Sequence, residues 1–471
     1  MLVECVRLAS ALALGATGAL ACSTGEPAAP ESGAVVQATP TYHRDVAPIL
    51  SRSCAKCHHE GGIGSFPLTS YEMARAMAPA MVDAVGARRM PPWGAHDTSE
   101  CRPPLPWRDD ERLSDDEIMT LQRWEASGAP EGDPSEAPAE IVPIQSNYLV
   151  TPTLEVEPRE DFVPTVSSGD EFRCFVIDVP ELEYGGYVSA VQVVAGNRRI
   201  VHHVSVYADI NGVASSRAGA DGSFDCSNRA GSVMAAVNGE QPSLSWLLAW
   251  APGARPLQLP SNLGIKVHPR SKVILEIHYS MNGTPPEPDR TKLQLTMAPT
   301  KPEYSLSSWA LGNAGGPFEN GDGLLPRPED GDDAPTFRIP AHARDHVEEM
   351  QQTFNLPFDA PVFAIRAHAH LAATDLKVDV VRDGASLCLL QDRWDFHWQR
   401  VYAYDAPFEH LPVLRAGDKV RVRCTYDNSI ANRRLGTELR DRGLQPMDVF
   451  LGDGSLDEMC LAELLYVQKS L

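Results

Sequence analysis

The stretch from Lys272 to Tyr279, KVILEIHY, is rich in β-branched residues and reads as a strand. Residues 377–380 (KVDV) and 419–424 (KVRVRC) alternate between apolar and polar side chains, which is the period of a half-buried strand. Between about residues 149 and 471, turn residues separate runs of this kind, and no helical periodicity is sustained. The pattern predicts two tandem all-β sandwiches, jelly-roll-like, over residues 149–300 and 301–471.

Histidines stand within these strand-like runs. His368 and His370 are two residues apart, so both imidazoles share one strand face and can reach one metal ion. His202 and His203 are adjacent, and neighbours on a flat strand point to opposite faces, so they can bind one metal only at a bulge or a twisted edge. A single His-x-His pair is a weak signal by itself. Other histidines fit ordinary surface or hydrogen-bonding roles: His268, His342, His346, His397 and His410.

The order of these histidines and the residues beside them carry a family resemblance. Over about residues 150–471 the chain resembles the copper type II monooxygenases, the family of peptidylglycine α-hydroxylating monooxygenase and dopamine β-monooxygenase. The shared features are an adjacent His pair, the segment LAWAPG, a later His-Tyr, a His-x-His pair and a Met in the run DEMC. The resemblance implies two β-sandwich domains with one copper each. It assigns the electron-transfer copper to His202, His203 and His278, and the oxygen-activating, catalytic copper to His368, His370 and Met459.

The donor types agree with copper. Three imidazoles suit an ion that cycles between oxidation states, and two imidazoles with a thioether favour Cu(I), the state that binds O₂. Neither set includes a cysteine thiolate as a ligand, so these are not blue-copper sites. Zinc also accepts three histidines, but zinc would leave Met459 unexplained.

One arginine is expected in the copper cleft. Strand alternation places Arg366 on the face of the His-x-His pair, and in the peptide-hydroxylating relatives an Arg at this position holds the substrate carboxylate. Those relatives also use an Asn and a Tyr after the Met, where this chain has Leu461 and Glu463. An internal Arg366–Glu463 pair would neutralise the anion site, so peptide amidation is not expected. The alternative reading of Arg366 is a structural ion pair.

Residues 54–58, CAKCH, form a C-x-x-C-H motif, the covalent attachment site of a c-type haem. Cys54 and Cys57 would bind the haem vinyl groups, and His58 would bind the iron. A zinc site would need a second ligand pair downstream, and a redox C-x-x-C pair would leave the histidine unexplained.

The sixth iron ligand is expected from a thioether on the far side of the haem. Met90, in the proline loop MPPW, is the candidate, and His59 and His96 are its rivals. A capping box at Ser114 and Glu117 predicts the start of a helix. Residues 41–134 therefore resemble a small all-α cytochrome c domain.

The N-terminus predicts export. Residues 8–21 are apolar and small, about the length of a signal-peptide core and too short to span a bilayer, so residues 1–21 read as a signal peptide. The run ALAC resembles a lipobox, with Cys22 as the lipidated residue of a cell-envelope or periplasmic lipoprotein; plain secretion is the alternative. Residues 22–40 and 135–148 are linkers rich in proline and small residues.

Six of the ten cysteines remain after the leader, lipid and haem positions are set aside. In an exported chain an even remainder indicates disulfides, with fifteen possible pairings. The family resemblance implies Cys424–Cys460 and suggests Cys174–Cys226, whereas Cys101 and Cys388 stay open.

Together these features predict a copper monooxygenase, an oxidoreductase that inserts one oxygen atom of O₂ into a C–H bond of a small organic substrate. Its cofactors would be two copper ions and one haem c. Electrons would pass from a periplasmic donor, either an ascorbate-like reductant or a redox protein, through the haem to the first copper and then to the second. The net charge of −22 argues against a nucleic-acid partner. The alternative is a non-catalytic envelope cytochrome or copper-binding electron-transfer protein.

Overall fold

The computed structural model describes residues 38–137, 151–167, 169–226, 244–252, 254–281, 285–313, 323–330, 335–452 and 454–470. The predicted signal peptide, Cys22 and most of the second linker lie outside these ranges. Within them, no helix combines the length and the apolar character that crossing a bilayer requires.

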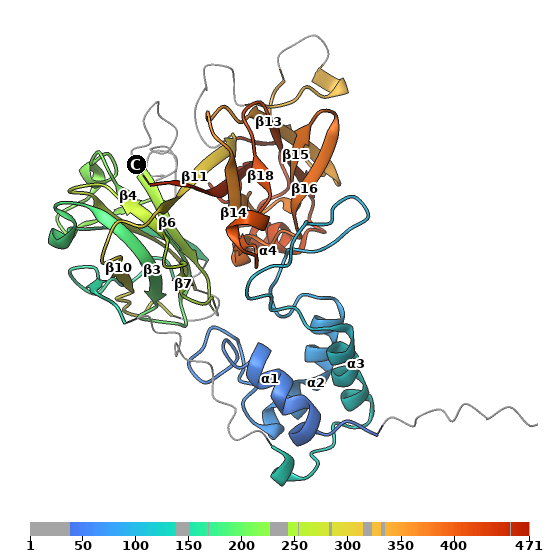
Figure 1. Ribbon diagram of the computed structural model, residues 1–471. Helices are drawn as coiled ribbons and strands as arrows, with labels where there is room; N and C mark the ends of the chain where they lie inside the picture. The colour runs from blue at the N-terminus through green and yellow to red at the C-terminus, as the bar shows by residue number, and fades with distance from the viewer. Residues whose placement is uncertain are drawn as a thin grey trace, which may run out of the picture. The chain divides into compact units, whose positions relative to one another are not determined.

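The first described region is a group of short helices around a small hydrophobic core (Figure 1). Leu50, Leu121 and Trp124 are fully buried in this core. Helix α3 begins at the predicted capping box, in which Ser114 Oγ accepts from the Glu117 backbone N–H and the Glu117 carboxylate accepts from Ser114 N–H. The helical elements are η1 (Tyr42–Val46), α1 (Ala47–Ser53), α2 (Tyr71–Gly86), α3 (Asp115–Ala126) and η2 (Pro134–Glu136).

Five antiparallel strands form the sheet that carries the first histidine group. Their order is β5-β2-β9-β4-β6, and β9 includes the whole stretch KVILEIHY. The suggested disulfide between Cys174 and Cys226 is present and joins β2 to the residue after β5. The strands are β2 (Asp170–Ile177), β4 (Val201–Asp209), β5 (Ser223–Asp225), β6 (Leu244–Trp250) and β9 (Lys272–Ser280).

A ten-stranded sheet runs through both predicted sandwich regions, in the order β1-β10-β3-β8-β11-β21-β14-β17, with β7 beside β3 and β18 beside β14. Strands β8 and β11 pair in parallel and join the two regions, because each supplies the backbone partners that the other would lack as an edge strand. The prediction of two tandem sandwiches did not include this sheet, which contains strands from both regions. The strands are β1 (Leu154–Val156), β3 (Gly186–Val194), β7 (Leu257–Gln258), β8 (Leu263–Val267), β10 (Lys292–Met297), β11 (Tyr304–Gly312), β14 (Ala360–His368), β17 (Val401–Ala403), β18 (Val413–Leu414) and β21 (Leu461–Lys469).

The second β region also contains a four-stranded sheet, β13-β19-β15-β16, and a pair, β12-β20. The implied disulfide Cys424–Cys460 joins β19 to the residue before β21. The expectation of strands alone is wrong at helix α4 (Arg433–Asp441), which Asn432 caps by accepting from two backbone N–H groups. The strands are β12 (Arg338–Ile339), β13 (His346–Thr353), β15 (Ala373–Arg382), β16 (Ala385–Asp392), β19 (Lys419–Tyr426) and β20 (Val449–Phe450). Short 3₁₀ turns are η3 (Pro180–Leu182), η4 (Ser215–Arg217), η6 (Pro328–Asp330), η7 (Phe396–Trp398) and η8 (Phe408–His410).

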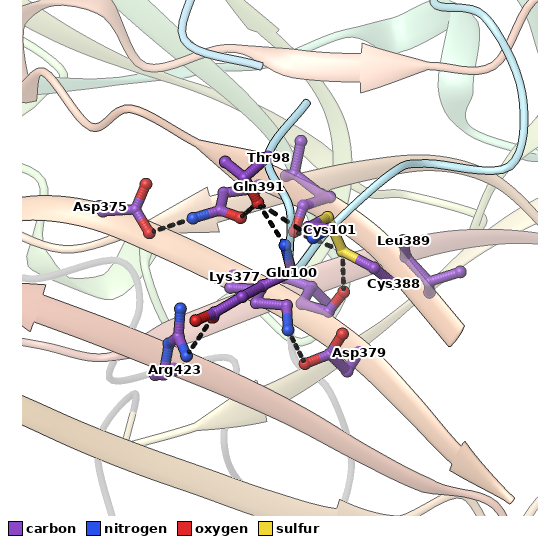
Figure 2. Close-up of a disulfide and its surroundings, with 12 residues drawn as sticks. Thr98, Glu100, Cys101, Asp375, Lys377, Asp379, Cys388, Leu389, Gln391 and Arg423 are labelled. Atoms are coloured by element: carbon purple, nitrogen blue, oxygen red, sulfur yellow. Dashed lines mark hydrogen bonds and ion pairs between the residues drawn. A yellow bond between two sulfur atoms is a disulfide. The ribbon is translucent and has the colours of Figure 1, made fainter. Parts of the chain in front are cut away.

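The remaining disulfide, which the sequence left open, joins Cys101 to Cys388 in β16 (Figure 2). It links residues 287 positions apart and attaches the loop that follows the Met90 segment to the second β region. Beside it, Thr98 Oγ1 donates to Gln391 Oε1 at 2.8 Å. The disulfide therefore links the helical and β regions covalently, in addition to the chain connection between them.

Candidate metal centres

The first histidine group lies on the neighbouring strands β4 and β9. His203 is directly opposite His278 in the antiparallel register, and the register shifts between Val201 and His203. This irregularity is the bulge that the adjacent His pair was predicted to need, and it allows His202 and His203 to face the same centre. All three histidine side chains are buried.

The three imidazoles converge through the same ring nitrogen. The Nδ1 atom of His203 lies 3.4 Å from Nδ1 of His202 and 3.1 Å from Nδ1 of His278. Burial lowers the pKa of His202 and of His203 well below the usual range, so these rings are neutral at pH 7. With Nε2 carrying the proton, the three Nδ1 lone pairs are directed at one point, and a metal cation at that point would satisfy all three.

The outer side of His278 is held by two neighbours. Its Nε2 lies 2.9 Å from Asp170 Oδ1, and the Phe172 ring stacks on the imidazole with centroids 4.3 Å apart. Burial by itself would raise the pKa of Asp170, but the interaction with His278 outweighs burial and lowers that pKa. The ionised carboxylate therefore favours a proton on Nε2 and leaves Nδ1 for the metal.

We expect Asp170→Asn to weaken copper binding at the first site by about 10- to 100-fold, because the neutral amide no longer orients the His278 ring or increases its basicity. Competition between the protein and a Cu(I) chelator measures this affinity. Asp178→Asn is the matched control, since Asp178 forms exposed ion pairs with Arg159 and Lys272. Equal affinity in the parent and Asp170→Asn would contradict the orienting role.

The second predicted donor set gathers at one end of the β14–β21 pair. His368 is the last residue of β14 and lies opposite Leu461, the first residue of β21. Met459 comes two residues earlier and is buried. His368, His370 and Met459 line one cavity of about 280 Å³, and His203 of the first group lines the same cavity.

In His368 and His370, the nitrogen left for a metal is Nε2, whereas in the first group it is Nδ1. His368 Nδ1 lies 2.8 Å from Gln399 Oε1, and His370 Nδ1 lies 3.1 Å from the carbonyl oxygen of Asp457. Both acceptors favour a proton on Nδ1, which leaves each Nε2 for a metal. Burial lowers the pKa of His368 well below its usual range and that of His370 to about 4, so both rings are neutral at pH 7. Two neutral imidazoles and a thioether form a soft donor set that suits Cu(I).

Glu458 fixes the backbone on both sides of this donor set. Its fully buried carboxyl group accepts backbone N–H bonds from His370 at 2.8 Å and from Ala372 at 2.6 Å. Two further bonds come from Ala373 and Met459, both at 3.2 Å. Burial raises the pKa of Glu458 to about 8, although the four N–H groups act in the opposite direction. One side chain therefore holds the His370 segment against the Met459 segment.

Arg366 and Glu463 form the internal pair that the sequence predicted. They are cross-strand partners on β14 and β21, with Nη1 and Oε2 4.0 Å apart. Both side chains are largely buried, and Arg366 lines the 280 Å³ cavity. Because Glu463 already balances the guanidinium charge, an additional substrate carboxylate would be poorly matched here.

The C-x-x-C-H residues lie in the turn after α1. Cys54 and Cys57 are unpaired with other cysteines, and burial raises their pKa values to about 12 and about 11. They are therefore thiols at pH 7. His58 Nδ1 lies 2.9 Å from the Phe66 carbonyl oxygen, which leaves Nε2 for an iron. Met90 packs against the same core cluster as Cys54. This arrangement fits a covalently attached haem.

Three residues near the metal centres were missed by the sequence reasoning. His397, assigned above to an ordinary role, is packed beside His202 with ring centroids 5.0 Å apart. Phe396 and Gln399 contact His370 and His368. All three belong to the irregular segment around η7, which has no periodicity or motif that could have identified it.

Comparisons with known proteins agree with this geometry. Two family models match the chain: the copper type II ascorbate-dependent monooxygenase N-terminal domain over residues 159–284, and the C-terminal domain over residues 348–470. DBH-like monooxygenase protein 1 of Mus musculus is 24% identical over 334 residues, covering 69% of this chain and 49% of the mouse protein. Its counterpart in Gallus gallus is 25% identical over 230 residues, covering 47% of this chain and 33% of the chicken protein. The chain thus spans at most about half of these relatives.

Among solved structures, the major capsid protein P2 of bacteriophage PM2 is similar at 11% identity with a TM-score of 0.24, covering 68% of this chain and 98% of the capsid chain.

Proposed function

Because the chain belongs to the copper type II ascorbate-dependent monooxygenase family, we propose that it hydroxylates a C–H bond of a small organic substrate. One atom of O₂ enters the C–H bond and the other leaves as water, so each turnover consumes two electrons and two protons. The main support is that donors from both histidine groups line one cavity of about 280 Å³. Substrate and O₂ can therefore meet at the second group within reach of the first.

Each donor set would hold one copper ion. We assign the first ion to His202, His203 and His278, through Nδ1, and the second to His368, His370 and Met459. When bound, the second ion supplies the Cu(I) chemistry that O₂ requires. Around it, Gln399 and the Asp457 carbonyl oxygen hold the two imidazoles in the Nδ1-protonated tautomer.

The cavity also limits the substrate class. Two arginines line the cavity. Arg366 pairs with Glu463 and Arg442 pairs with Glu438, so each positive charge already has a carboxylate partner. We therefore propose a substrate without a free carboxylate. Peptide amidation, in which a terminal carboxylate is held at this position, does not fit.

We propose that the electrons arrive through a haem c bound to Cys54, Cys57 and His58, with Met90 as the sixth ligand. A haem with both axial positions filled has no place for O₂, so its role would be restricted to electron supply. A tethered carrier also keeps its effective concentration high. The donor would be an ascorbate-like reductant or a redox protein of the cell envelope, where a lipid on Cys22 would anchor the enzyme.

The proposal is tested by copper loading followed by turnover under ¹⁸O₂. We expect two coppers and one haem per chain, and ascorbate-dependent incorporation of a single ¹⁸O atom into members of a library of small uncharged or cationic metabolites, detected by mass spectrometry. The matched control is His203→Ala, which should bind one copper fewer. A chain that binds haem but no copper would instead support a simple cytochrome and reject the monooxygenase.

A further inference from the structure

Residues 396–400 lie between the two histidine groups and touch both. The Phe396 ring centroid is 6.1 Å from that of His278 and 5.9 Å from that of His370. The next residue, His397, lies beside His202. The segment therefore bridges the first and second donor sets by direct ring contacts.

The end of the same segment reaches the haem-attachment turn. Gln399 accepts from His368 Nδ1 at 2.8 Å. Its neighbour Arg400 donates to Glu111 Oε2 at 3.1 Å, and Lys56 pairs with the other oxygen of Glu111. Lys56 is the residue directly before Cys57 in the C-x-x-C-H motif. A path of covalent bonds, hydrogen bonds and ion pairs thus connects this motif to a ligand of the second site.

This path is shielded from solvent. The side chains of Lys56, Glu111 and Arg400 are 14%, 9% and 10% exposed. The Arg400 guanidinium also lies over the ring of Trp93, 5.6 Å from its centroid. Burial makes these ion pairs less sensitive to salt screening than surface pairs, so the contact is expected to persist at physiological ionic strength.

The surrounding contacts keep the path in place. The Cys101–Cys388 disulfide and the ion pair between Glu100 and Arg423 cross the same boundary (Figure 2). Gly94 packs so closely on β16 that a Cβ atom there would lie 1.8 Å from Asp392 Oδ1. A side chain larger than that of glycine at position 94 would therefore clash with the end of β16.

We propose that the Lys56–Glu111–Arg400–Gln399 contact is the entry route by which electrons from the haem-attachment region reach the His368 site directly, without first visiting the His202 group. This inference rests on the proposed function and reverses the order expected from the sequence. The reason is the bonding: Gln399 is hydrogen-bonded to His368, whereas the contacts of the segment with the first group are ring contacts. Electronic coupling is stronger through bonded atoms than across a gap.

Each transfer moves one electron. Ferrous haem becomes ferric, one Cu(II) becomes Cu(I), and no bond or proton needs to change. A one-electron donor of the ascorbate class then reduces the haem again. Glu111, Arg400 and Gln399 act as positioning residues, because none of them is itself expected to bind a metal.

Protein that carries ferric haem and Cu(II) is mixed rapidly with one equivalent of reductant, without O₂ or substrate, so that the haem is reduced first. The haem absorbance then reports, in a stopped-flow instrument, how fast the haem is oxidised again by Cu(II). His203→Ala removes the first site and His370→Ala removes the second. We expect haem oxidation to stay fast with His203→Ala and to slow at least tenfold with His370→Ala. Equal rates in the two variants, or a slower rate in His203→Ala, would overturn the route.

Arg400→Leu in the His203→Ala background should slow haem oxidation at least tenfold, and Arg400→Lys should restore most of the rate. Arg423→Leu is the matched control, because it removes another ion pair across the same boundary but does not contact Gln399. An unchanged rate in Arg400→Leu would reject the path. Excess ascorbate can reduce both coppers directly, so ¹⁸O incorporation does not depend on this route. If ¹⁸O is incorporated but Arg400→Leu leaves the rate of haem oxidation unchanged, only the route is rejected. If the chain binds no copper, the proposed function is rejected.

Discussion

Replacing Met459 by isoleucine is expected to lower the hydroxylation rate by roughly 100-fold or more while leaving the first copper site intact. Loss of a residue that merely supports a metal ligand typically costs about 10- to 100-fold, so loss of a direct ligand should cost at least as much. Isoleucine has a similar volume and no donor atom, so the buried position stays filled while the soft ligand that favours Cu(I) disappears.

The measurement combines product formation under ¹⁸O₂ with copper content and thermal unfolding. Met447→Ile is the matched control, because Met447 is 66% exposed and does not line the cavity that the donors share. The free energy of unfolding should change by less than about 1.5 kcal/mol, as for other volume-conserving core substitutions. Full oxygen-dependent turnover in Met459→Ile would show that the second site has been assigned to the wrong residues.

Replacing Glu458 by leucine is expected to lower the free energy of unfolding by roughly 3–5 kcal/mol, because four buried backbone N–H groups lose their acceptor and each unsatisfied group costs about 1–3 kcal/mol before the backbone relaxes. The groups belong to His370, Ala372, Ala373 and Met459. Since His370 and Met459 are proposed copper ligands, copper affinity at the second site should fall by about 10- to 100-fold as well.

Denaturant unfolding followed by circular dichroism gives the stability, and competition with a Cu(I) chelator gives the affinity. Glu409→Leu introduces the same change at an exposed position and should leave both nearly unchanged. Glu458→Gln keeps one acceptor oxygen and should lie between the parent and the leucine variant. A leucine variant as stable as the parent would mean that these N–H groups find other partners, and that Glu458 does not hold the site together.

Two of the proposed ligand pairs could be predicted from spacing, because each pair depends on neighbours in the chain. The period of a strand places His368 and His370 on one side. The same period demanded an irregularity at His202 and His203, which the register shift of β4 against β9 confirms. The C-x-x-C-H motif is likewise complete within residues 54–58, because all its donors lie on a single turn.

By itself, then, the sequence determined the β character of the chain and the haem motif, and it predicted that His368 and His370 share one face, because short-range spacing specifies which side chains lie together. His278 and Met459 entered the proposed donor sets through the family resemblance. Only the tertiary structure decided which segments meet: β8 with β11, Cys101 with Cys388, and Arg400 with Glu111. These contacts join residues up to hundreds of positions apart. They form because buried strands, charges and backbone groups must be paired in the folded molecule, and local sequence patterns do not specify which distant groups pair.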